Sequence, residues 1–223
     1  MVEQEGTLTR ARLKTPRAAA MAGIVFSILL LTSLVLIRIS VPANPEDAGT
    51  WFSSGWKTVS LALHLLPFAG IAFLWFIGVL RDRMGASEDR FFATVFLGSG
   101  LLFLAMLFAS AAVAAGIMMV YRTTPGKLME FGTYTFGRTV AYEIVNVYAM
   151  RMAGVFMIST CTLSIRTGIF PRWMAFLGYG LALVLLLSSG YLYWAPLAFP
   201  LWVLLISVHI LLANLKPKPA SDL

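Results

Sequence analysis

The 223-residue chain has few of the residues on which soluble enzymes rely for chemistry. It contains one cysteine and two histidines, and only 12% of its residues are charged. The single cysteine, Cys161, excludes an intrachain disulfide framework. The sequence also lacks Cys-x-x-Cys, His-Glu-x-x-His, Gly-x-x-x-x-Gly-Lys and Gly-x-Ser-x-Gly motifs. We therefore predict no metal site and no cofactor, and the sequence does not favour an enzyme.

Hydrophobic residues, in contrast, are abundant and occur in long runs. They make up 59% of the chain, whereas about 45–50% is usual for a soluble domain. So large an apolar excess indicates that lipid solvates much of the surface, which makes the lipid bilayer the first predicted partner. The net charge of +7 comes from short basic segments beside the apolar runs. We interpret this charge as a topology signal and predict no nucleic-acid partner.

Six apolar runs approach or exceed the 20 or so residues that a spanning helix needs. They predict an all-α polytopic membrane protein with six transmembrane helices. The first run is longer than the apolar part of a signal peptide, so we expect it to be retained. A basic tail, 1–17, precedes the transmembrane domain, 18–215, and a short tail, 216–223, follows it. The runs are Ala18–Ile39, Thr58–Leu80, Phe91–Tyr121, Thr139–Ile165, Trp173–Trp194 and Ala198–Asn214.

The basic residues predict the orientation of these helices. With the N-terminus in the cytoplasm, eleven Lys and Arg residues lie in inner segments and four in outer segments. This bias agrees with the positive-inside rule. Both termini are then cytoplasmic, and we predict a multi-pass protein of the cytoplasmic (inner) membrane. Tryptophan and tyrosine are expected at the membrane interfaces, and here Trp51, Trp56, Tyr191, Tyr193 and Trp194 lie at predicted outer edges and Trp173 at an inner one.

Glu143 is the only acidic residue inside a long apolar run. A charge in hydrocarbon costs roughly 2.5–3.5 kcal/mol by insertion scales, so it needs a partner, water or a function. Counted from Thr139 at about 1.5 Å per residue, Glu143 lies about 6 Å below the outer end of its run. Arg151 shares that run, and in an ideal α-helix it is about 80° around and about 12 Å along the axis from Glu143.

Several other polar residues fall in the outer halves of predicted helices. Ser60 and His64 are four residues apart and share a helix face. His64 is expected at a depth of about 9 Å, close to that of Glu143. The candidate outward-opening cluster consists of Arg38, Ser60, His64, Glu143, Asn146 and Arg151.

Two interpretations of this cluster remain open. One is a substrate or proton site in a small permease-like transporter, because burial and neighbouring charges readily shift the proton affinities of Glu and His. The other is a structural plug, in which Arg38 extends to the headgroups, Glu143 is neutralised by Arg38 or a helix-end amide, and His64 bonds to a backbone carbonyl.

The third apolar run carries small residues at helical spacing. Ala105, Ala109, Ala112 and Gly116 recur at intervals of four, three and four. Small residues on one face allow helix backbones to approach closely in membranes. The face is expected to pack within the chain, in a homo-oligomer or against a membrane partner. It underlies a second functional hypothesis, a non-catalytic accessory or assembly subunit of a membrane complex.

The inner loop after the second run reads Gly78-Val-Leu-Arg-Asp82-Arg83-Met-Gly85. It resembles the loop signature between the second and third helices of major facilitator transporters, which has Gly, Asp, Arg and Gly at these relative positions. The resemblance implies that Asp82 and Arg83 belong to a cytoplasmic gate between helices. It covers eight residues, and the chain continues with Ala86-Ser-Glu-Asp-Arg90 instead of further basic residues. A charged turn between two helices is the alternative.

Two predicted outer segments are rich in turn-forming and aromatic residues. We expect Ser40–Trp56, which contains Pro, Asn, Gly and Ser around its aromatic residues, to lie along the outer interface. The segment Thr123–Gly137 is expected to be either an interfacial loop or a lid over the outer face.

Overall fold

The computed structural model describes residues 2–42, 51–84, 90–124, 132–187 and 194–215. Every regular element in these residues is a helix, which confirms the all-α prediction. The three segments α5, η2 and α6 follow one another without a break and form one long helix. The elements are α1 (Val2–Ser40), α2 (Phe52–Met84), α3 (Arg90–Thr123), α5 (Thr133–Glu143), η2 (Ile144–Ala149), α6 (Met150–Thr167), α7 (Arg172–Leu187), η3 (Ala195–Leu197) and α8 (Ala198–Leu215).

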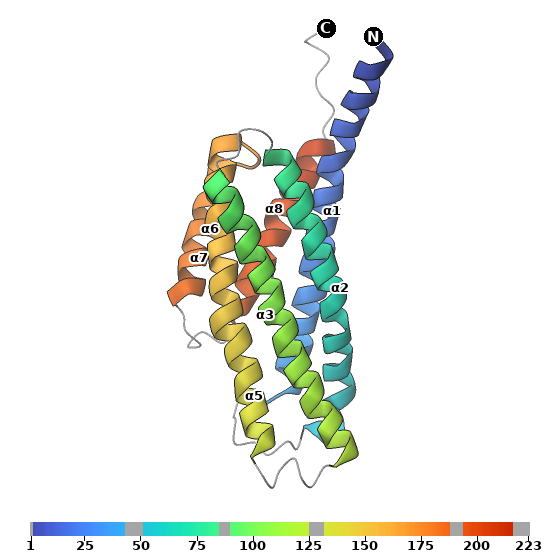
Figure 1. Ribbon diagram of the computed structural model, residues 1–223, viewed down its shortest axis with the longest axis vertical. Helices are drawn as coiled ribbons and strands as arrows, with labels where there is room; N and C mark the ends of the chain where they lie inside the picture. The colour runs from blue at the N-terminus through green and yellow to red at the C-terminus, as the bar shows by residue number, and fades with distance from the viewer. Residues whose placement is uncertain (1, 43–50, 85–89, 125–131, 188–193, 216–223) are drawn as a thin grey trace.

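Successive helices run in opposite directions along one bundle (Figure 1). The start of α1 and the end of α8 lie at the same end, which we call the terminal end. The starts of α2 and α5 lie at the other end, which we call the distal end. Gly168 leads from α6 towards α7 with a φ of 70°, a left-handed conformation that glycine adopts without strain.

Five of the described helices are long and apolar enough to cross a membrane. They correspond to five of the six predicted runs, and the chain is a multi-pass integral membrane protein on this basis. The remaining run, Trp173–Trp194, contains α7, which has 16 residues. The rest of that run, 188–193, lies outside the described residues. Three helices begin well before the apolar pattern predicts: α1 at Val2 instead of Ala18, α2 at Phe52 instead of Thr58 and α5 at Thr133 instead of Thr139.

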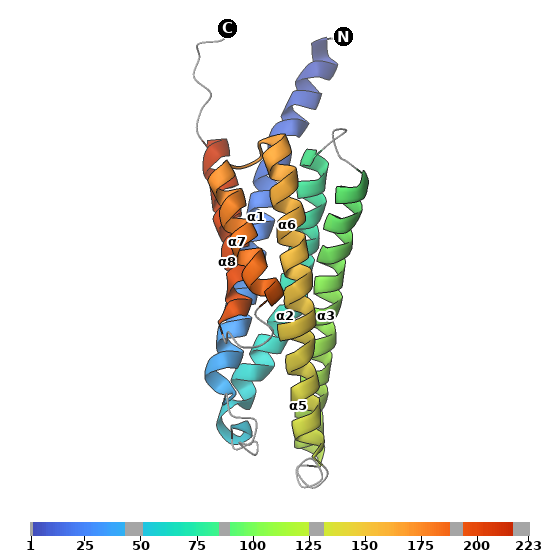
Figure 2. The ribbon, with the colours of Figure 1, turned by 90° about the vertical axis from the view of Figure 1, so that its left-hand side faces the viewer.

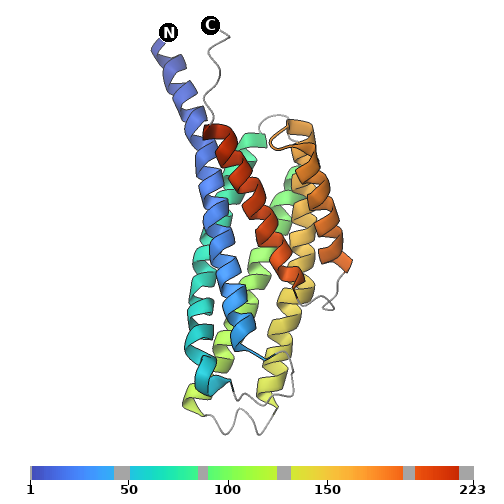
Figure 3. The ribbon, with the colours of Figure 1, turned by 180° about the vertical axis from the view of Figure 1, so that it is seen from behind.

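The helices α7 and α8 form a hairpin that occupies only the terminal part of the bundle (Figures 2 and 3). The last turns of α7 pack against α6 at Gly154. A Cβ added to Gly154 would lie 3.1 Å from the carbonyl oxygen of Ala182 and 3.1 Å from Cγ of Leu186, so α6 and α7 are nearly in backbone contact there. Distal to this level the bundle consists of α1, α2, α3 and the α5–η2 helix.

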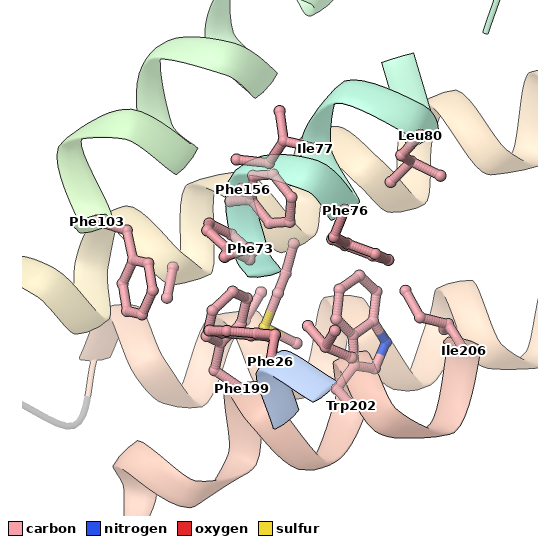
Figure 4. Close-up of a cluster of buried hydrophobic side chains, with 14 of the residues drawn as sticks. Phe26, Phe73, Phe76, Ile77, Leu80, Phe103, Phe156, Phe199, Trp202 and Ile206 are labelled. Carbon is pink, nitrogen blue, oxygen red and sulfur yellow. The ribbon is translucent and has the colours of Figure 1, made fainter. Parts of the chain in front are cut away.

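Aromatic rings from five helices fill the core in the terminal half (Figure 4). Phe73 of α2 lies at the centre, with ring centroids 4.5 Å from Phe26, 5.2 Å from Phe156 and 5.7 Å from Phe199. All four side chains are fully buried. Helices gain little from burying apolar surface that lipid would solvate equally well, so this close packing of rings is what holds them together.

Small residues set the helix crossings around this core. In α7, a Cβ on Gly178 would overlap Sγ of Cys161 and would lie 2.7 Å from Nε1 of Trp202. Between α1 and α8, a Cβ on Gly23 would overlap Oγ of Ser207. Glycine at these positions lets α6, α7 and α8, and α1 and α8, approach more closely than any side chain would allow.

Candidate functional site

A cavity of about 530 Å³ lies in the distal half of the bundle. Its walls come from α1, α2, α3 and the α5–η2 helix, and Pro196 of η3 contributes from the turn before α8. The position follows from the lengths of the helices. The α7–α8 hairpin fills the space beside α1 only in the terminal half, so the four longer helices enclose space beyond it.

The cavity is mostly apolar with a small group of charged and polar residues. The apolar residues that line it include Leu34, Leu63, Leu66, Leu107 and Met118. Its charged residues are Arg38, Arg138 and Glu143. Its other residues with polar side-chain atoms are Trp51, Ser110, Tyr134, Thr139, Tyr142 and Asn146. An apolar pocket with a few convergent polar groups is the usual form of a small-molecule site.

Three members of the predicted cluster line this one cavity: Arg38, Glu143 and Asn146. Ser60, His64 and Arg151 are not among its lining residues. His64 is exposed on the face of α2 that also exposes Leu61 and Phe68. Its Nδ1 lies 2.6 Å from the carbonyl oxygen of Ser60, so the ring N–H donates within its own helix. The structure thus brings together half of the six predicted residues.

The segment after Glu143 departs from α-helical geometry. Residues Ile144–Ala149 form a π-helix, in which the N–H of Met150 bonds to the carbonyl of Val145, five residues back. The extra residue in the turn shifts the faces on either side by about one residue, or roughly 100°. The predicted angle of about 80° between Glu143 and Arg151 assumed an unbroken α-helix and is therefore wrong. Glu143 faces the cavity, whereas Arg151, beyond the π-helix, is not part of its lining.

Two side chains donate hydrogen bonds to backbone carbonyls just before the π-helix. Oγ of Ser110 in α3 donates to the carbonyl oxygen of Ala141 at 2.8 Å. Nδ2 of Asn146 donates to the carbonyl oxygen of Tyr142 at 2.9 Å. In a π-helix each backbone N–H bonds to the carbonyl five residues back instead of four, so a carbonyl at the junction with the α-helix can lose its backbone donor. The side chains of Ser110 and Asn146 supply donors to two carbonyls at this junction. Asn146 thus has a structural role besides its place in the cavity wall.

An aromatic cluster closes the distal end next to the cavity. Phe52 stacks on Trp51 with ring centroids 4.1 Å apart and on Tyr121 at 4.2 Å, and its ring meets Tyr134 edge-on at 5.5 Å. Trp51, Phe52 and Tyr134 are buried. The structure therefore corrects the prediction that Trp51 belongs to an interfacial aromatic belt. It packs inside the protein because α2 and α5 begin earlier than the apolar pattern indicates.

Arg138 joins three parts of the distal end. Its guanidinium donates to Oη of Tyr134 at 3.3 Å and to the carbonyl oxygen of Pro42, beyond the end of α1. Nε1 of Trp51, at the start of α2, donates to the same tyrosine oxygen at 2.9 Å. This network sets the wall of the cavity at its distal end. The predicted site residues do not include Arg138, Trp51 and Tyr134, because aromatic and basic residues at span ends are typical of ordinary interfacial anchors.

The chain matches no protein-family model, no curated protein and no solved structure. Within the described residues, no group of three or more His, Cys, Asp or Glu side chains is placed to hold a metal ion.

The remaining predicted site residues lie away from the cavity. Asp82 and Arg83 fall in the last turn of α2, which ends at Met84, and their side chains and the following loop, 85–89, lie outside the described part of the chain. The two outer segments are also only partly described, since 43–50 and 125–131 fall outside it. Their described ends form helix: residues 133–137 are the first part of α5.

The small-residue face of α3 points away from the bundle. Ala105, Ala109, Ala112 and Gly116 are all exposed, and a Cβ on Gly116 would have no atom within 4 Å. No helix of this chain therefore covers that face within the described residues.

Proposed function

We propose that this integral membrane protein is permease-like and takes up a small molecule in the cavity of the distal half. The observation that supports this proposal best is the meeting of Arg38, Glu143 and Asn146, from two separate long helices, at one cavity of about 530 Å³. A charged group beside a partly open apolar cavity provides both orientation and affinity for a small molecule. A structural plug would instead fill this space with side chains.

We infer a six-span topology in which the distal end faces outward. Eleven of the Lys and Arg residues then lie at the cytoplasmic end of the bundle or in the tails beyond it. The start of α1 and the end of α8 lie at the same end, as an even number of spans requires. Under this orientation the cavity lies in the outer half of the protein, and the cytoplasmic membrane is the proposed location.

A count of residues along the helices supports a position of the cavity at the outer boundary of the hydrocarbon. A hydrocarbon core of about 30 Å corresponds to about 20 helical residues. Counted from Arg81 in α2 and from Arg166 in α6, the outer boundary falls near Leu61 and Asn146. Glu143 then lies just beyond the boundary, where its carboxylate can be hydrated, while Leu66 lies within it. This position removes most of the cost that a carboxylate in hydrocarbon would carry.

Substituted-cysteine labelling tests whether the cavity is open to water. Single cysteines introduced in place of Glu143 and Asn146 are expected to react from outside with a membrane-impermeant thiosulfonate. The native Cys161 is fully buried and gives a low background. A matched pair of controls replaces Phe68 and Ile71, which are exposed on the outer face of α2, lie deeper in the proposed hydrocarbon and do not line the cavity. Those two are expected to react slowly, because lipid solvates them.

The proposal fails if the Glu143→Cys and Asn146→Cys variants stay unmodified in the membrane but react after denaturation. It also predicts that Glu143→Gln alters ligand binding, because Glu143 lines the cavity. His64→Gln, in which the altered side chain faces away from the cavity, is the control and is expected to leave binding unchanged.

A second function, assembly with a membrane partner, is favoured by the exposed small-residue face of α3. Ala105, Ala109, Ala112 and Gly116 offer a surface on which another helix can approach closely. Ala112→Leu is expected to abolish co-purification of a partner or of a second tagged copy of the chain. Val184→Leu, on the exposed face of α7, is the control. An unchanged complex in Ala112→Leu contradicts this second function.

A further inference from the structure

We infer that the ligand of the distal cavity is a single-chain amphiphile with one negative charge, such as a medium-chain fatty acid, drawn from the outer leaflet. The inference rests on the proposed function, since it names the class of molecule that the cavity would take. Three properties of the cavity support it: the position of the charged residues distal to the leucines, the volume, and the sign of the charge of the described lining residues.

The charged lining residues lie in the distal part of the cavity, whereas leucines dominate its terminal part. On α1, Arg38 is one turn distal to Leu34, and on α2 the lining residues continue from Val59 to Leu63 and Leu66 in the terminal direction. On α3 the lining extends from Met118 to Leu107, a length of about 16 Å along the helix axis. An elongated cavity whose three charged residues all lie distal to its leucines matches an amphiphile aligned with the lipids.

The hydrocarbon part of such a ligand would lie among aliphatic side chains. Leu66 and Leu107 are buried, and Leu34 and Leu63 pack against the buried cores. At about 30 Å³ for each water-sized group, a cavity of about 530 Å³ holds roughly 18 non-hydrogen atoms. A chain of about twelve carbons with a carboxylate head lies within this limit. A two-chain phospholipid exceeds it.

The charged lining favours an anionic head. Among the described lining residues, two carry a guanidinium group, Arg38 and Arg138, and one carries a carboxylate, Glu143, a balance of one formal positive charge. Arg138 is held in place by Tyr134 and by the carbonyl of Pro42, and Arg38 is one turn before Pro42 in the chain. Guanidinium groups form strong, directional hydrogen bonds with carboxylates. The carboxylate of Glu143 would repel a doubly charged anionic head more strongly than a singly charged one, so the lining favours a head with a single negative charge.

Equilibrium binding to the full chain in phosphatidylcholine nanodiscs tests the inference. Radiolabelled dodecanoate is the probe, at a pH at which it is ionised, and unlabelled dodecanol and dodecyltrimethylammonium compete with it. We expect dodecanoate to bind more tightly than either. Arg38→Gln is expected to weaken dodecanoate binding about tenfold and to leave dodecanol competition unchanged, because it removes one charged hydrogen-bond donor. Arg38→Lys, which keeps the charge, is expected to recover part of the loss.

Variants at two neighbouring alanines of α3 distinguish binding in the cavity from binding at the lipid-facing surface. Ala114 lines the cavity, whereas Ala115 is exposed on the outside of the same helix. Ala114→Phe is expected to abolish saturable dodecanoate binding, and Ala115→Phe to leave it intact. If Ala114→Phe abolishes binding but the three head groups compete equally, or the ammonium binds best, the inference on charge is overturned and the ligand cavity stands. If Ala114→Phe changes nothing, the amphiphile site itself is overturned. The cysteine labelling at positions 143 and 146 then decides the proposed function separately.

Discussion

The hydroxyl of Ser110 donates a hydrogen bond of 2.8 Å to the carbonyl oxygen of Ala141. This bond joins α3 to α5 three residues before the π-helix begins, and both residues line the distal cavity. The same bond therefore holds two helices together, serves a backbone carbonyl at an irregular part of a helix, and fixes one wall of the candidate site.

Ser110→Ala removes this bond and is expected to destabilise the protein by about 0.6–1.7 kcal/mol, the range for hydrogen bonds between membrane helices. Ser99→Ala is the matched control on α3. Ser99 is also buried, but its hydroxyl bonds only to carbonyls of its own helix, Val95 and Phe96. Equilibrium unfolding in mixed micelles measures both variants. An equal or larger effect of Ser99→Ala would contradict a special role for the bond between α3 and α5.

Deletion of Val147 tests the π-helix. Removal of one residue lets the helix continue in α-geometry and rotates α5 relative to α6 by about 100°. Tyr134 and Arg138 then turn away from Trp51 and Pro42. We expect faster hydrogen exchange at the start of α2, near Phe52, with unchanged protection in the core. Val147→Ala keeps the register and is the control. Unaltered exchange near Phe52 in the deletion variant would show that the π-helix does not position the distal end.

Tyr134→Phe tests the aromatic cluster. The phenol oxygen accepts hydrogen bonds from Trp51 and Arg138, so its removal leaves two buried or half-buried donors without this partner. A cost of about 1–3 kcal/mol is expected. Trp51→Phe removes only one donor and keeps a ring. Thermal unfolding of the two single variants and the double variant gives their coupling, which we expect to be at least about 0.5 kcal/mol. Strict additivity would argue against a direct interaction.

Two glycines of α7 provide a matched test of helix packing. Gly178→Ala places a methyl group against Sγ of Cys161 and is expected to cost about 1–3 kcal/mol through overpacking. Gly180→Ala meets no atom within 4 Å. It is expected to be neutral or to stabilise the helix by up to about 1 kcal/mol. Unfolding measurements in the same micelles compare the two, and similar effects would contradict the close contact of α7 with Cys161 and Trp202.

Much of the fold is predictable from the order of apolar runs. The end of α1 and both ends of α8 lie within one residue of the predicted boundaries, because the apolar runs end at those positions. The distal starts of α2 and α5 lie six residues before the predicted ones. Residues 52–57 and 133–138 mix polar and apolar side chains, so the sequence pattern does not indicate a spanning helix there. These turns are stable because Trp51, Phe52 and Tyr134 pack on one another across helices. A hydropathy pattern contains no information on that contact.

The candidate site is predictable only in part. Arg38, Glu143 and Asn146 are recognisable because charges and amides in apolar runs are exceptional. Depth along the helix also suggested His64 and Arg151, but depth does not give the direction of a side chain around the axis. His64 faces away from the cavity, and the π-helix changes the direction of residues on either side of it.

The sequence by itself determined that this chain is helical and membrane-embedded, because apolar segments in lipid must satisfy their backbone hydrogen bonds internally. It also determined which rare polar residues needed an explanation. Only the tertiary structure decided which of them meet. The short α7–α8 hairpin occupies only the terminal part of the bundle, and Glu143, the last residue of α5 before the π-helix, lines the cavity beyond it. Both depend on how helices far apart in the chain pack together.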